Sequence, residues 1–130
     1  MDDTKILVVE DESIIGLNIK KKLKSFGYTV PAIVATGKEA IKMADITFPD
    51  LVLMDVRLKG DMDGVDTAEK IRENYDIPII YLTAYSDDEV LEKAKKTKPY
   101  GYIVKPFKAD DLHSNIEMAL YRHKMEKDLQ

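Results

Sequence analysis

The stretch "LVLMDVRLKGDMDG", residues 51–64, decides the fold of this chain. It opens with four consecutive apolar residues, and an apolar run without alternation predicts a strand that is covered on both faces. Asp55 follows this run directly, and a polar loop that contains two glycines follows Asp55. A carboxylate at the mouth of a buried strand is costly unless other groups compensate it. Asp55 therefore needs partners from elsewhere in the chain.

The same alternation of apolar strand and amphipathic helix repeats along the whole chain. Apolar strands are predicted at residues 5–10, 28–35, 50–55, 78–83 and 100–105. Each is followed by apolar residues at helical spacing, and Pro31 places the second strand at an edge or a bulge. Five such units predict an α/β fold, with a parallel sheet and helices on both of its faces.

Cap residues and glycines predict where the helices begin and end. Ser13 is the expected N-cap of the first helix, and Gly27 is its expected stop. The last helix is expected to begin near Asp110 and to carry His113 and His123 on its surface. Two pairs fit capping boxes, namely Thr36 with Glu39 and Ser86 with Glu89.

The composition limits the class of protein. The chain has 130 residues, of which 45% are hydrophobic, so one domain with a core of its own is expected. The net charge of −4 argues against a nucleic-acid surface. The chain has no cysteine, which excludes disulfides and is compatible with a reducing cytoplasm. No apolar run approaches the roughly 18 residues of a membrane helix, and the acidic start does not resemble a signal peptide.

Reactive side chains stand at the ends of four predicted strands. The first strand ends in Glu10 and Asp11, the third in Asp55, the fourth in Thr83 and the fifth in Lys105. Function in such sheets gathers beyond the carboxyl ends of the strands, so we expect these residues to converge. The predicted site holds three carboxylates, one hydroxyl and one ammonium group.

These residue types point to phosphoryl chemistry with a metal ion. Without histidine or cysteine the site cannot be a hydrolytic triad. Carboxylates are the ligands of a hard cation, and Mg²⁺ is commonly bound by one or two of them beside phosphate. Lys105 could hold an oxyanion, and Asp55 is a plausible nucleophile toward phosphorus.

Four motifs together resemble the receiver domain of bacterial and archaeal two-component response regulators. They are "VVEDE" at residues 8–12, "LVLMD" at 51–55, "YLTAY" at 81–85 and "YIVKPF" at 102–107. The resemblance covers about residues 5–125. It implies a flavodoxin-like, doubly wound sheet of order 2-1-3-4-5, with a receiver domain over residues 1–125. Residues 126–130 would then be a helix extension or the start of a linker.

The resemblance also implies roles for the site residues. Asp55 would be the phosphoacceptor, and Mg²⁺ would be held by Asp11, Asp55, Glu10 and the backbone carbonyl of Arg57. Lys105 would contact the phosphoryl oxygens.

A switch and a cis peptide are implied as well. Thr83 would bond to the phosphoryl group after transfer, and Tyr102 would be the aromatic switch that turns inward when Thr83 moves. The Lys105–Pro106 bond would be cis.

The implied function is a phosphorylation-activated signalling switch in the cytoplasm. A sensor histidine kinase would be the phosphodonor, and the domain would catalyse its own phosphorylation and dephosphorylation without being a turnover enzyme. The face of the fourth helix, fifth strand and fifth helix would change and could form a homodimer. No direct nucleic-acid binding and no membrane insertion are expected.

Other functions stay open at this point. An Mg²⁺-dependent aspartyl phosphatase is one, although Arg57 stands where haloacid-type phosphatases carry a second aspartate. A flavin carrier or a purely structural receiver-like module are others. The first strand–helix turn lacks the phosphate loop of flavodoxins, and the complete set of acids, threonine and lysine speaks against a structural module.

The loop after Asp55 departs from the common family pattern. It has no proline and is one residue longer, a form that resembles receivers attached to sensor kinases. A receiver module cut from a hybrid sensor kinase is therefore a further alternative. Asp61 and Asp63 are expected to serve the turn, and Asp63 is also expected to cap the helix that begins near Val65.

Overall fold

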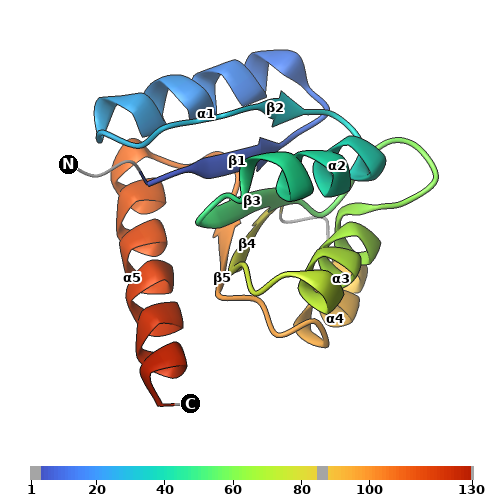
Figure 1. The fold of residues 1–130 in the computed structure, drawn as a ribbon. Coiled ribbons are helices and arrows are strands. Elements are labelled where there is room, and N and C mark those ends of the chain that lie inside the picture. The colour runs from blue at the N-terminus through green and yellow to red at the C-terminus, as the bar shows by residue number, and fades with distance from the viewer. Residues whose placement is uncertain (1–3, 85–87, 130) are drawn as a thin grey trace.

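The computed structural model shows one parallel sheet of five strands in the order β2-β1-β3-β4-β5 (Figure 1). The structure describes residues 4–84 and 88–129. The predicted α/β class and strand order are therefore confirmed. The strands are β1 (Ile6–Val9), β2 (Ile33–Val34), β3 (Leu51–Asp55), β4 (Ile79–Thr83) and β5 (Gly101–Val104).

Helices cover both faces of this sheet. One face carries α1 and α5, and the other carries α2, α3 and α4 (Figure 1). The helices are α1 (Ser13–Ser25), α2 (Gly37–Thr47), α3 (Gly64–Asn74), α4 (Asp88–Lys95) and α5 (Ala109–Asp128).

The central strand β3 is buried along its whole length, which explains its apolar sequence. Alternate side chains point to opposite faces of a strand, so β3 contributes to two separate cores. Leu51 and Leu53 pack beneath α1 and α5, whereas Val52 and Met54 pack beneath α2 and α3. Asp55 is the last residue of this strand.

The second strand is much shorter than the sequence predicts. Only Ile33 and Val34 pair as a strand, although an isolated bridge joins Lys5 to Thr29. Pro31 has no N–H to donate, and the segment lies at the edge of the sheet as Pro31 predicts.

The ends of α1 confirm one boundary prediction and correct another. Gly27 follows the helix with φ +92° and donates to the carbonyl of Lys24, so it is the expected stop. Ser13 is not the N-cap. The carbonyl of Glu12 accepts the first helical bond from Gly16, which makes Glu12 the N-cap and Ser13 the first helical residue.

The predicted capping box before α2 is present in altered form. Thr36 Oγ1 accepts from the Glu39 amide at 3.2 Å, but the Glu39 carboxylate accepts from the amide of Ala35 rather than from that of Thr36. The second predicted box depends on Ser86, which lies outside the described residues.

The two histidines of α5 correct the expectation that both are surface residues. His113 stacks on Phe26 with ring centroids 4.3 Å apart, so it joins α5 to the end of α1. The side chain of His123 is only 15% exposed, and its Nε2 lies 3.0 Å from Asp76 Oδ1. The apolar face of α5, which periodicity predicts, is correct: Leu112, Ile116 and Ala119 are buried.

Candidate functional site

The carboxyl ends of β1, β3, β4 and β5 meet at one edge of the sheet. Within this register Asp55 lies beside Leu82, and Thr83 lies beside Val104. Glu10 and Lys105 each follow the last residue of a strand directly. Parallel pairing therefore brings together residues that are up to 95 positions apart in the sequence.

Three carboxylates form a tight cluster at this edge. One ligand oxygen each from Glu10, Asp11 and Asp55 lies within 4.8 Å of the others. Glu10 is 2% exposed and Asp55 is 6% exposed. The described residues contain no second such cluster of histidine, cysteine or acidic groups. These oxygens form a set that a hard cation could use.

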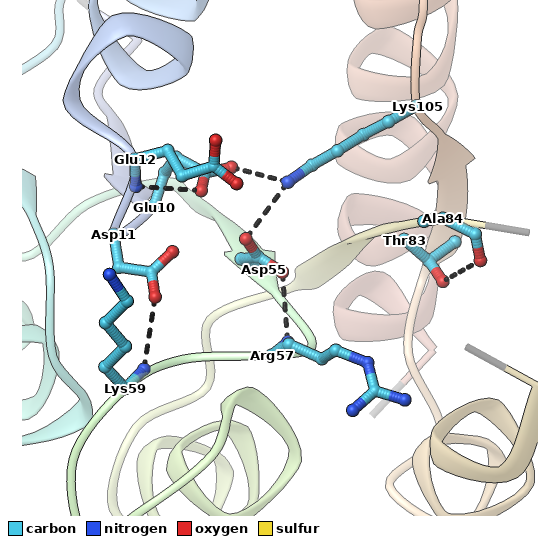
Figure 2. A network of polar contacts seen from close by, with 9 residues as sticks. All are labelled: Glu10, Asp11, Glu12, Asp55, Arg57, Lys59, Thr83, Ala84 and Lys105. Atoms are coloured by element: carbon cyan, nitrogen blue, oxygen red, sulfur yellow. Dashed lines mark hydrogen bonds and ion pairs between the residues drawn. The ribbon is translucent and has the colours of Figure 1, made fainter. Parts of the chain in front are cut away.

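Lys105 lies across two of these carboxylates (Figure 2). Its Nζ donates to Glu10 Oε1 at 2.7 Å and to Asp55 Oδ2 at 3.0 Å. The ammonium group therefore compensates part of the negative charge that the strand ends bring together.

Burial and neighbouring groups shift the pKa values of Glu10 and Lys105. Burial, followed by the close carboxylate of Asp55, raises the pKa of Glu10 to about 7 despite the bond from Lys105. Burial alone would lower the pKa of Lys105, but its bonds to Glu10 and Asp55 and their charges raise it. Near neutral pH this site is therefore able to hold a proton or a cation at Glu10.

Backbone amides hold the other carboxylate oxygens. The amide of Arg57 donates to Asp55 Oδ1 at 3.0 Å, and the amide of Lys59 donates to Asp11 Oδ2 at 3.2 Å. Figure 2 shows the guanidinium group of Arg57 directed away from the three carboxylates. The loop between β3 and α3 thus fixes both aspartates through its main chain.

The sequence did not single out how this loop is anchored. Val56 and Leu58 are buried in the core, whereas Arg57 between them is exposed. This alternation of apolar and polar residues continues the strand pattern beyond Asp55. It is the signal that could have predicted that Val56 and Leu58 anchor the loop in the core.

Thr83 is the last residue of β4, at the same edge of the sheet as the cluster, whereas Tyr102 lies two residues before the end of β5. Thr83 is buried, and its hydroxyl donates to the carbonyl of Ala84 at 3.3 Å. Tyr102 is half-buried, and its ring packs on that of Tyr81 with centroids 6.1 Å apart. The Lys105–Pro106 peptide is cis, as expected.

The two later acids of the opening stretch do not belong to the cluster. Asp63 caps α3, because its Oδ1 accepts from the amide of Asp66 at 2.8 Å. Asp61 is an exposed loop residue beside Gly60, which has φ +103°. The expected cap role of Asp63 is confirmed.

The cluster opens to solvent through a hollow of about 560 Å³. Asp11, Asp55, Arg57, Ala84 and Lys105 are among the residues that line it. A small anionic group could therefore reach Asp55, and an oxygen-binding cation could reach the carboxylates beside it.

Comparison with known proteins now decides the family. The family model described as the response regulator receiver domain matches residues 6–117. The chain belongs to the response regulator receiver domain family. Receiver domains of two-component systems are phosphorylation-dependent signalling switches rather than turnover enzymes, and they accept phosphate from histidine kinases.

Relatives of this receiver domain are longer proteins. The transcriptional regulatory protein PdtaR of Mycobacterium tuberculosis is 36% identical over 118 residues, which are 91% of this chain and 57% of that protein. ZraR of Escherichia coli, also named a transcriptional regulatory protein, is 37% identical over 120 residues, or 92% of this chain and 27% of that protein. The chain thus spans about half or less of these two relatives.

A solved structure shows the same receiver fold over almost the whole chain. The signal receiver domain of a modulated diguanylate cyclase from Desulfovibrio desulfuricans G20 is 38% identical, with a TM-score of 0.91. The match covers 96% of this chain and 99% of that one. Within the described part of the chain, no helix is both long and apolar enough to cross a bilayer.

Proposed function

We propose that Asp55 accepts a phosphoryl group from the phosphohistidine of a sensor histidine kinase. One observation carries this proposal. Lys105 Nζ bonds to Asp55, and both residues line the same open hollow, so a nucleophilic carboxylate and a cation face the same approach path. The chain carries the set of residues that in-line phosphoryl transfer needs.

One carboxylate oxygen of Asp55 forms a bond to phosphorus while the phosphorus–nitrogen bond of the phosphohistidine breaks. The bonding electron pair returns to the imidazole nitrogen. Lys105, already beside Asp55, donates to an oxygen of the transferred group, and the amide of Arg57 keeps the carboxylate oriented. Catalysis is mainly positioning and electrostatics.

The acidic cluster suits Mg²⁺, which would neutralise charge on the phosphoryl oxygens when bound. Asp11, Asp55 and Glu10 would hold the ion, together with the backbone carbonyl of Arg57. The close carboxylates of Glu10 and Asp55 support this. Burial and, after it, the neighbouring Asp55 raise the pKa of Glu10, and a divalent cation would relieve the repulsion between the two groups.

The phosphoryl group would be read out through Thr83 and Tyr102. The group brings about −1.5 to −2 charges and strong acceptors, so the Thr83 hydroxyl would turn toward it. Tyr102 would follow, and the surface of α4, β5 and α5 would change and could form a homodimer. On this surface, Val104 of β5 is a partly exposed apolar residue, which fits a contact between two copies.

The test is phosphorylation in solution. Wild type and Asp55→Asn are incubated with Mg²⁺ and a small acyl phosphate, and intact mass is recorded. Wild type should gain one phosphoryl group, and Asp55→Asn should gain none. Asp61→Asn, which removes a loop acid outside the cluster, is the matched control and should behave as wild type. A wild type without the added mass contradicts the proposal.

The same samples test the alternative function. An Mg²⁺-dependent phosphatase would release phosphate from generic monoesters over many turnovers. A receiver domain should release at most the phosphate that it has accepted.

A further inference from the structure

Tyr81 is a buried tyrosine that the proposed chemistry does not use. It has no exposed surface, and it lies on β4 directly opposite Tyr102 of β5. The two rings are inclined by 27° with centroids 6.1 Å apart. The hydroxyl of Tyr81 lies 2.8 Å from Oγ1 of Thr97. One side chain thus touches both the expected switch residue and the segment that follows α4.

The direction of the Tyr81–Thr97 bond follows from the hydroxyl of Thr97. Thr97 Oγ1 donates to the carbonyl of Ala94 at 2.7 Å. A threonine hydroxyl has one hydrogen to donate, so Tyr81 must be the donor to Thr97. Burial raises the pKa of Tyr81 to about 12, which keeps this donor protonated near neutral pH.

Thr97 lies in the turn that ends α4 and leads to β5. Its amide donates to the carbonyl of Ala94, and the carbonyl of Lys98 accepts from Arg72 of α3 at 3.0 Å. The turn is therefore held by its own backbone, by α3 and by the phenol of Tyr81. Among these contacts, only the phenol of Tyr81 connects the turn to the ring of Tyr102.

We propose that Tyr81 is a positioning residue that couples the ring of Tyr102 to the end of α4 through its bond to Thr97. This rests on the proposed role of Tyr102. Thr83 is two residues beyond Tyr81 on the same face of β4, so a ring that moves toward Thr83 slides along Tyr81. Tyr81 is enclosed in the core, and its shift is passed to the hydroxyl that holds Thr97.

A plain structural role makes a different prediction. If Tyr81 only fills the core and satisfies its hydroxyl, Tyr81→Phe lowers stability and leaves the response of the α4 turn intact. The two roles are therefore distinguished by how strongly the amide of Thr97 responds to a change at Tyr102. A loss of stability is expected for both roles and does not distinguish them.

The first experiment follows the amide resonance of Thr97 by NMR when beryllofluoride and Mg²⁺ are added. The shift of this resonance in Tyr81→Phe should fall to less than about half of the wild-type shift, because the coupling passes through the hydroxyl. Thr97→Val should lower the shift of the neighbouring Lys98 amide in the same way, whereas Thr97→Ser should keep it. Tyr75→Phe, which removes a tyrosine hydroxyl bonded to Asp45, is the matched control and should respond as wild type.

A second experiment needs no phosphoryl mimic. Tyr102→Leu removes the ring that packs on Tyr81, and it should shift the Thr97 resonance in the unmodified protein. The same change in a Tyr81→Phe background should shift it by less than about half as much. Equal shifts in both backgrounds, or an unmoved Thr97 resonance, overturn the coupling.

The two experiments separate the two proposals. If wild type does not take up beryllofluoride but Tyr102→Leu still moves Thr97 through Tyr81, the phosphoacceptor proposal fails and the coupling stands. If beryllofluoride binds and Tyr81→Phe responds as fully as wild type, the coupling fails and the phosphoacceptor proposal is untouched.

Discussion

Glu10 is the residue at which burial has its clearest electrostatic consequence. Its pKa rises from 4.5 to about 7 in the folded chain, so between these values the folded state binds more protons than the unfolded state. Stability then falls as pH rises through this window, by up to about 3 kcal/mol. Denaturant unfolding of the metal-free protein between pH 4.5 and pH 8 measures this.

Glu10→Gln isolates this effect from the titration of other groups. The amide cannot titrate, so the difference in free energy of unfolding between variant and wild type should grow with pH and level off above about pH 7. A difference that stays constant from pH 4.5 to pH 8 would show that the pKa of Glu10 is not raised.

The sequence predicted which residues meet at the site but not how they touch. Strand ends converge in a parallel sheet whatever the rotamers, so Glu10, Asp55 and Lys105 could be assigned from position alone. The bond from Tyr81 to Thr97 depends on the length of a buried side chain and on where α4 ends. Neither quantity is encoded in periodicity.

At the scale of one element, the N-terminus of α3 shows that two neighbouring acids have different roles. Asp63 caps the helix through the amide of Asp66, whereas Asp61 is exposed in the loop. Asp63→Ala should lower the free energy of unfolding by about 1 kcal/mol, and Asp61→Ala should change it by less than about 0.5 kcal/mol. Urea denaturation of both variants measures this. Equal losses would contradict the cap assignment.

The same helix begins with a glycine that packs against the end of β3. A Cβ at Gly64 would lie 1.8 Å from the carbonyl oxygen of Asp55, which forces the backbone of the site to move. Gly64→Ala should therefore cost about 2 kcal/mol or more and should also slow phosphorylation of Asp55. Urea denaturation and intact mass test the two effects.

Gly101→Ala is the matched control for that substitution. A Cβ there would meet its nearest atom at 3.6 Å, which is an ordinary contact. Its effect on stability should stay below about 0.5 kcal/mol. If both alanine variants behave alike, the close approach of Gly64 to Asp55 is not what determines the stability of this loop.

The elements that the sequence misjudged are those with little burial of their own. β3 was predicted almost to the residue because its apolar run is covered on both faces. The length of β2 and the start of α1 were predicted less well. The length of β2 depends on its backbone pairing at the sheet edge, and the N-cap of α1 depends on whether the carbonyl of Glu12 or that of Ser13 accepts the first helical bond.

At the scale of the whole molecule, the sheet builds one site from four separate strand ends, and the repulsion of their carboxylates is a cost to folding. If Mg²⁺ binds only the folded chain, it should raise the free energy of unfolding by mass action, by about 2.7 kcal/mol at a concentration of 100 times its Kd. Thermal unfolding with and without Mg²⁺ should therefore show a rise in Tm that Asp11→Asn loses and Asp61→Asn keeps.

Protons should compete with Mg²⁺ for the carboxylate of Glu10. A proton on Glu10 lowers the charge of the cluster, and its pKa is about 7, so the rise in Tm should be smaller at pH 5.5 than at pH 8. In Glu10→Gln the rise in Tm should depend less on pH, because the carboxylate for which protons and Mg²⁺ compete is gone. A rise in Tm that is equal in wild type and Asp11→Asn would place the bound Mg²⁺ outside the three-carboxylate cluster.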